Sequence, residues 1–167
     1  MTENTPPVTP LLKAGLHPEA SSALRKAGFT AQDISQTVGF ASASAGTHGP
    51  DGTVDGKEYA ACTDFHITGF SDARVKTILT RIWDAGFAAW YRNPGHDHWP
   101  AEDARHIHAV YTGIVMKQIV QEQVHDFLRQ PMLNGLASHQ PYAFAQNTHD
   151  QRTAIRTLFS KHYHLDF

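Results

Sequence analysis

The chain has 167 residues but only one cysteine, Cys62. A single cysteine excludes an internal disulfide and a zinc knuckle built from several cysteines. Any bound metal would therefore have to be held by histidine and carboxylate side chains. Cys62 lies beside an apolar run, and we interpret it as a small buried residue rather than a nucleophile.

The sequence also lacks an excess charge of one sign and a long hydrophobic run. Its formal net charge is −2 at pH 7, which gives no reason to expect binding to nucleic acid or to an anionic membrane. No apolar run approaches the roughly 20 residues needed to cross a bilayer. With 167 residues, of which 41% are hydrophobic, the chain is long and apolar enough to form one core. We expect a flexible tail over residues 1–12 and a single domain over residues 13–167.

Histidine, in contrast, is abundant, with 12 residues in the chain. Two of them form the pair His106-Ile107-His108, and Glu102 lies six residues before the second. In a strand, side chains alternate between the two faces, so both imidazoles would point to the same side. Zinc accepts neutral imidazole, and a catalytic zinc keeps one position open for water. A histidine pair beside a carboxylate therefore suits metal-assisted hydrolysis.

Further candidate ligands lie upstream. His48 follows a small-residue segment, and Asp64 opens an apolar run rich in β-branched residues. A loop and the end of a strand would bring these two side chains towards the strand that carries His106 and His108. The resulting order is His, Asp, Glu and then His-x-His.

This order resembles the zinc-peptidase superfamily that contains the bacterial D-alanyl-D-alanine carboxypeptidases and dipeptidases and, more distantly, the hedgehog signalling domain. The resemblance covers residues 44–112, through Ser44-x-x-x-His48, Cys62-Thr63-Asp64 and the segment from Glu102 to His108. It implies that His48, Asp64 and His108 bind Zn²⁺.

The same resemblance assigns the catalytic roles. Glu102 is expected to be the base, and His106 to hydrogen-bond the attacked oxygen or the attacking water. The implied function is a zinc metallopeptidase that hydrolyses the stem peptides of peptidoglycan. Two alternatives stay open: a hedgehog-like pseudo-enzyme that keeps zinc while its groove binds a partner, and an α+β domain without metal.

Two features depart from the family pattern. His48 and Asp64 lie 16 residues apart, and the intervening segment 49–56 contains two Asp-Gly pairs typical of hairpin turns, which indicates an inserted surface loop. In addition, no arginine precedes Ser44, where the family's carboxypeptidases bind the substrate carboxylate. We therefore predict an endopeptidase, with a D,D-carboxypeptidase as the alternative if Arg92 or Arg105 supplies the charge.

Three other histidines lie near these segments. His66 would share a strand face with Asp64, either as a hydrogen-bonding neighbour of the metal ligands or as a packed polar residue. His96 and His98 form a second His-x-His pair, but the prolines and glycine around them indicate a substrate-facing loop over the site, with a second metal site as the alternative.

Hydrophobic periodicity predicts the remaining elements. We expect helices over residues 18–27, 71–85, 114–129 and 148–162, and strands from Asp64 to Thr68, over residues 87–92 and around His106. The helix at 114–129 carries an apolar stripe: Val115, Ile119, Val120, Val124, Phe127 and Leu128. The predicted fold is α+β, with a small, mainly antiparallel sheet that carries the zinc site and is flanked by helices.

The N-terminal residues lack the positive and apolar regions of a secretory signal peptide. We therefore expect synthesis in the cytoplasm, and an enzyme acting on the cell wall would need a dedicated secretion system or lysis. A peptidoglycan peptide is the expected partner, and the sequence does not predict an oligomeric state.

Overall fold

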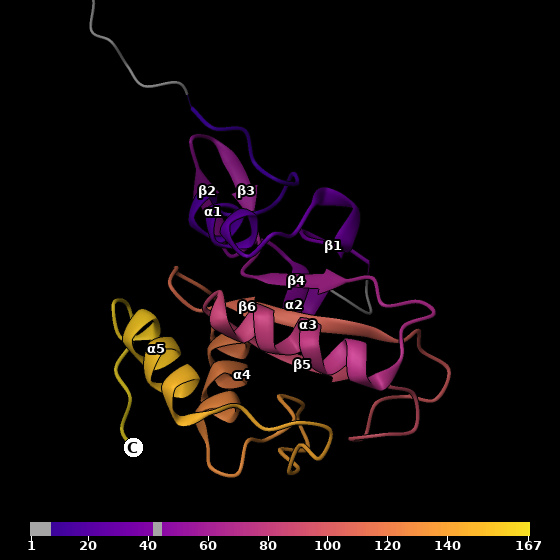
Figure 1. Cartoon of the computed structure of the whole chain (residues 1–167). Helices are drawn as coiled ribbons and strands as arrows, with labels where there is room; N and C mark the ends of the chain where they lie inside the picture. Colours follow the sequence, from indigo (N-terminus) through magenta and orange to yellow (C-terminus); the bar gives the residue numbers. More distant parts are fainter. Residues whose placement is uncertain (1–7, 42–44) are drawn as a thin grey trace, which may run out of the picture.

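The computed structural model describes residues 8–41 and 45–167 and shows an α+β fold (Figure 1). Its central sheet has four antiparallel strands in the order β1-β4-β6-β5. These strands are β1 (Ile34–Gln36), β4 (Cys62–Phe65), β6 (His106–Tyr111) and β5 (Phe87–Arg92). A separate antiparallel hairpin pairs β2 (Gly52–Val54) with β3 (Lys57–Tyr59).

Helices flank the central sheet. They are α1 (Pro18–Lys26), α2 (Ala45–His48), α3 (Asp72–Asp84), α4 (Gln118–Leu128) and α5 (His149–Phe159), with a short 3₁₀ helix, η1 (Ala31–Asp33). In Figure 1, α3 crosses the sheet, and it packs along β5, whereas α4 packs against both β5 and β6. The predicted small antiparallel sheet with flanking helices is therefore confirmed. No helix among the described residues is long and apolar enough to span a membrane.

Local signals fix several boundaries as predicted. Ser71 caps α3 by accepting a hydrogen bond from the Arg74 amide, and Gly86 follows the helix with a φ of 90°, a conformation that glycine adopts without strain. Thr148 and Gln151 form a capping box at the start of α5. Both ends of α3 and the start of α5 are therefore determined by residues next to them in the sequence.

Other boundaries differ from the predictions. The strand expected from Asp64 to Thr68 runs instead from Cys62 to Phe65. The helix expected from residue 114 begins at Gln118, and Val115 and Ile119 of its apolar stripe are 52% and 46% exposed. By contrast, the hairpin turn expected from an Asp-Gly pair in segment 49–56 is confirmed, because Asp55 and Gly56, with φ of 51° and 73°, form the turn between β2 and β3. Residues 1–7 of the predicted tail and Ser44 lie outside the described residues.

The strand register places the candidate site residues on one face of the sheet. Asp64 pairs with His108, which also pairs with Trp90, and His106 pairs with Arg92. Directly paired residues share a face of an antiparallel sheet. These five side chains therefore project together, on the face where Phe127 of α4 packs against Trp90 with the ring centroids 5.8 Å apart.

Candidate metal centre

Three of the predicted site residues form a compact buried cluster. Oδ1 of Asp64 lies 3.1 Å from Nε2 of His48 and 3.0 Å from Nδ1 of His108. All three side chains are buried, and their possible ligand atoms lie within 4.8 Å of one another. His48, Asp64 and His108 come from the end of α2, from β4 and from β6, so distant parts of the chain converge on a group that could hold a metal ion.

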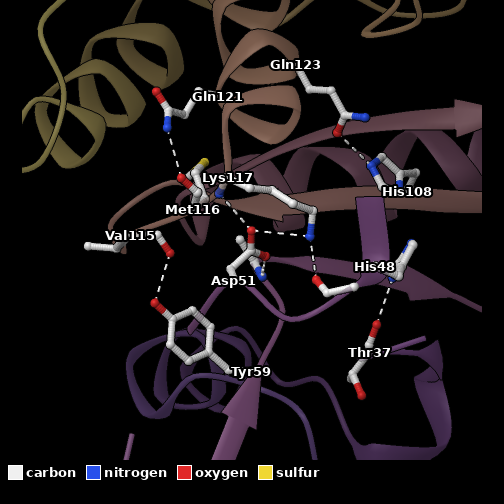
Figure 2. Close-up of polar contacts among 12 residues, drawn as sticks. Thr37, His48, Asp51, Tyr59, His108, Val115, Met116, Lys117, Gln121 and Gln123 are labelled. Carbon is white, nitrogen blue, oxygen red and sulfur yellow. Dashed lines mark hydrogen bonds and ion pairs between the residues drawn. The ribbon is translucent and has the colours of Figure 1, made fainter. Parts of the chain in front are cut away.

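On each imidazole, the outer nitrogen, which points away from Asp64, is held by an oxygen acceptor (Figure 2). Nδ1 of His48 donates to the carbonyl oxygen of Thr37 at 2.8 Å, and Nε2 of His108 donates to Oε1 of Gln123 at 2.9 Å. In a neutral imidazole only one nitrogen carries a hydrogen. The inner nitrogens, Nε2 of His48 and Nδ1 of His108, are therefore the ones whose lone pairs face Asp64.

This arrangement fits a metal ion. Two neutral imidazoles facing one carboxylate oxygen would direct lone pairs at a negative charge. Protonating one ring leaves the other lone pair in that position, and protonating both would bury two extra charges side by side. A cation between the inner nitrogens and the carboxylate resolves this conflict. Two imidazoles and one carboxylate form a ligand set that zinc accepts, and acceptors that hold the outer nitrogens are typical of bound histidines.

The pKa shifts of the cluster agree with a tightly coupled site. Without a metal ion, burial opposes ionisation of Asp64, but the hydrogen bonds that His108 and His48 donate when their inner nitrogens are protonated outweigh it and hold the pKa of this carboxyl well below its usual range. Burial lowers the pKa of His108, and Asp64 only partly offsets that effect. For His48, burial is outweighed by the hydrogen bond to Asp64, so its pKa is raised. Asp64 is therefore an anion at neutral pH, as a metal ligand must be.

An ion pair between the buried carboxylate of Asp51 and the partly exposed Lys117 fixes the segment that follows His48. The carboxylate of Asp51 accepts hydrogen bonds from the amides of Ala61, at 2.7 Å, and Lys117, at 2.8 Å (Figure 2). Nζ of Lys117 lies 3.4 Å from the same carboxylate and donates to the carbonyl oxygen of Gly49. Asp51 thus ties the chain after α2 to the start of β4 and to the N-terminus of α4.

A cavity of about 610 Å³ opens beside the cluster. Besides the three candidate ligands, its lining includes His66, Arg92, Trp99, Asp103, Arg105, His106 and Gln123. Nε2 of His106 lies 3.8 Å from Oδ2 of Asp64, and its ring packs edge-on against Trp99 with the centroids 5.2 Å apart. The structure therefore brings His106 to the position beside the ligands that the sequence predicts.

Two arginines contribute cations to this cavity. Arg92 is only 3% exposed, and its Nη1 donates to the carbonyl oxygen of Asn134 at 2.6 Å. Burial lowers the pKa of Arg92 to about 10, so the side chain is still charged at neutral pH. Arg105 donates from Nε to the hydroxyl of Tyr91 at 2.7 Å. The sequence alone did not show whether either arginine lies at the site, and both do.

Glu102, the predicted base, lies in an exposed turn before β6. It is not among the residues that line the cavity, whereas the adjacent Asp103 is. His66 lines the cavity with an exposed side chain. His96 and His98 lie in the loop before β6, and His98 borders a neighbouring cavity with Trp99 rather than the metal cluster.

Sequence reasoning did not identify Thr37, Asp51 and Gln123. The sequence contains one weak indication of a role for Gln123, because this polar residue lies at helical spacing among the apolar residues Val120, Val124 and Phe127. Thr37 acts through its backbone carbonyl, so its side chain carries no information about this contact.

Comparison of the chain with protein-family models, with curated proteins and with solved structures finds no match. The assignment of a function therefore rests on the order of the candidate ligands in the sequence and on the geometry of the cluster.

Proposed function

We propose that this protein is a zinc-dependent peptidase that hydrolyses peptide bonds in the stem peptides of bacterial peptidoglycan. The observation that carries the proposal is the buried His48-Asp64-His108 cluster, with both outer nitrogens held by acceptors, beside an open cavity. The resemblance of the ligand order to the D-Ala-D-Ala peptidase and hedgehog superfamily supplies the reaction and the substrate class.

His48, Asp64 and His108 would hold the zinc ion, which supplies Lewis acidity and lowers the pKa of water. Nδ1 of His106 donates to the carbonyl oxygen of Ala104, so Nε2, which lies 3.8 Å from Oδ2 of Asp64, would donate a hydrogen bond to the oxygen of the attacked carbonyl when the ring is protonated. Glu102 would accept the proton of the attacking water and return it to the leaving amine. Glu102 lies in the exposed turn that precedes β6 and does not line the cavity, so its role as base is supported by the resemblance alone, whereas the adjacent Asp103 lines the cavity.

Arg92 favours a second candidate, a D,D-carboxypeptidase. The endopeptidase prediction depends on the lack of a cation for a terminal carboxylate. Arg92 is a buried cation on the cavity wall, and Arg105 lines the same cavity. A guanidinium binds a carboxylate in a bidentate manner, so either side chain could receive the free C-terminus of a substrate.

Digestion of purified peptidoglycan by the zinc-loaded protein, followed by mass spectrometry of the products, tests both candidates. Cleavage inside cross-linked stems supports the endopeptidase, whereas free terminal D-alanine as the only small product supports the carboxypeptidase. His108→Ala is the matched inactive control. If the parent protein binds zinc but releases no product, the peptidase proposal is wrong and the pseudo-enzyme interpretation is favoured.

A further inference from the structure

A second hollow adjoins the metal cavity along α4. It has a volume of about 280 Å³ and shares three lining residues with the metal cavity: Thr47, Gln123 and Leu136. Gln123 therefore contacts His108 and also borders the second hollow. The two hollows are thus neighbours along α4, and together they are called the groove.

One face of α4 forms a wall of this second hollow. Ile119, Glu122, Gln123 and Asp126 all line it, at positions i, i+3, i+4 and i+7 of the helix. Residues at this spacing lie on the same side of an α-helix. The exposure of Ile119 is thereby explained, since this apolar residue of the predicted stripe faces the groove instead of the core.

His139 and Asp126, which contact each other, also line the second hollow. Nδ1 of His139 lies 2.9 and 3.0 Å from the two carboxylate oxygens of Asp126, which is 5% exposed. The amide of Gly135 donates to the same carboxylate at 3.1 Å. The His139 side chain is 55% exposed, so its ring forms part of the surface of the hollow.

Glu122 supplies the accessible negative charge of this hollow. Its carboxylate is exposed, whereas the buried carboxylate of Asp126 is already held by His139 and the Gly135 amide. No lysine or arginine is among the described residues that line the hollow, and Ile119, Leu136 and Ala137 provide aliphatic surface. An aliphatic wall with an exposed carboxylate complements a methylene chain with a terminal ammonium group.

We propose that this end of the groove is a substrate subsite for an alkylammonium side chain, of the kind that lysine carries. Methylene groups pack on Ile119 and Leu136, and the ammonium group pairs with the exposed carboxylate of Glu122. This subsite deepens the proposed function and rests on it, because it assigns a basic side chain to the peptide that extends from the scissile bond.

Binding of a small probe tests the subsite without requiring catalysis. In NMR titrations of the full-length, zinc-loaded protein, Nα-acetyl-lysine amide is expected to shift the Ile119 methyl and His139 ring signals. Nα-acetyl-norleucine amide has the same methylene chain without the charge, and it should bind about three- to fivefold more weakly. Equal affinity for the two probes, or no shift at these signals, would overturn the proposal.

Two variants separate a specific effect from a general one. Glu122→Gln removes one exposed carboxylate and should abolish most of the preference for the lysine probe. Glu58→Gln removes an exposed carboxylate on β3, outside this groove, and should leave the preference unchanged. If Glu122→Gln keeps the full preference, the subsite assignment is wrong.

A hydrolysis assay distinguishes failure of the subsite from failure of the peptidase proposal. Stem peptides with lysine or with Nε-acetyl-lysine are compared at equal concentration. Hydrolysis of both at the same kcat/KM would refute the subsite while retaining the peptidase. Binding of the lysine probe without hydrolysis of either peptide would support the subsite and refute the peptidase.

Discussion

Gln123 accepts a hydrogen bond from His108, over 2.9 Å between Oε1 and Nε2, although these residues belong to a helix and a strand. The contact places the hydrogen of His108 on Nε2 and leaves the lone pair of Nδ1 facing Asp64. Helix α4 therefore contacts the candidate metal centre without supplying a candidate ligand.

Replacing Gln123 with methionine should weaken zinc binding. The substitution removes the acceptor at Nε2 while keeping a side chain of similar length, and loss of such a contact typically reduces metal affinity about 10- to 100-fold. Competition with a chelator of known affinity measures the change. Gln121→Met, on the same helix, is the control, because Gln121 bonds to the carbonyl oxygen of Met116. If Gln123→Met and Gln121→Met bind zinc with equal affinity, the hydrogen bond from His108 to Gln123 does not contribute to zinc binding.

The protein should contain about one zinc ion per chain, and either Asp64→Ala or His108→Ala should remove it. Each variant leaves only two protein ligands, which cannot retain the ion during dialysis. Elemental analysis of protein purified without a histidine tag gives the stoichiometry. His66→Ala is the matched control, because His66 lines the cavity but is not part of the cluster. Full occupancy in both ligand variants would rule out this site.

Glu102→Gln should retain the fold and the zinc but reduce turnover of stem peptides about 100-fold or more, the scale expected for loss of a general base. Asp103→Asn is the informative comparison, because Asp103 lines the cavity and Glu102 lies beside it in the turn. We expect a smaller loss for Asp103→Asn. If Asp103→Asn lowers kcat more than Glu102→Gln does, Asp103 and not Glu102 is the base.

Asp51→Asn should lower the free energy of unfolding by about 2 kcal/mol, the scale for losing hydrogen bonds to a buried charged acceptor. Its carboxylate accepts from the amides of Ala61 and Lys117 and pairs with the Lys117 ammonium. Urea denaturation measures the effect. Asp55→Asn, in the exposed hairpin turn, should change stability little because asparagine also tolerates its positive φ. If both variants unfold at the same urea concentration, the ion pair between Asp51 and Lys117 is not stabilising.

Much of the local structure could be predicted because its signals lie next to the elements that they specify. Ser71 and Gly86 mark the ends of α3, Thr148 marks the start of α5, and the alternation of His106 and His108 holds in β6. The start of α4 could not be predicted in this way. It depends on a hydrogen bond from the Lys117 amide to Asp51, 66 residues earlier in the chain.

The sequence by itself determined which residue types are available for a metal and in what order they occur. With one cysteine, only histidines and carboxylates could form such a site, and the spacing at His106 and His108 put both on one face of a strand. Only the tertiary structure decided that the register of β4 and β6 pairs Asp64 with His108, and that α2 delivers His48 to the same oxygen. It likewise placed Arg92 and Gln123 beside the cluster. Contacts between strands and helices depend on packing of the whole chain, and a periodic pattern along one segment contains no information about its distant neighbours.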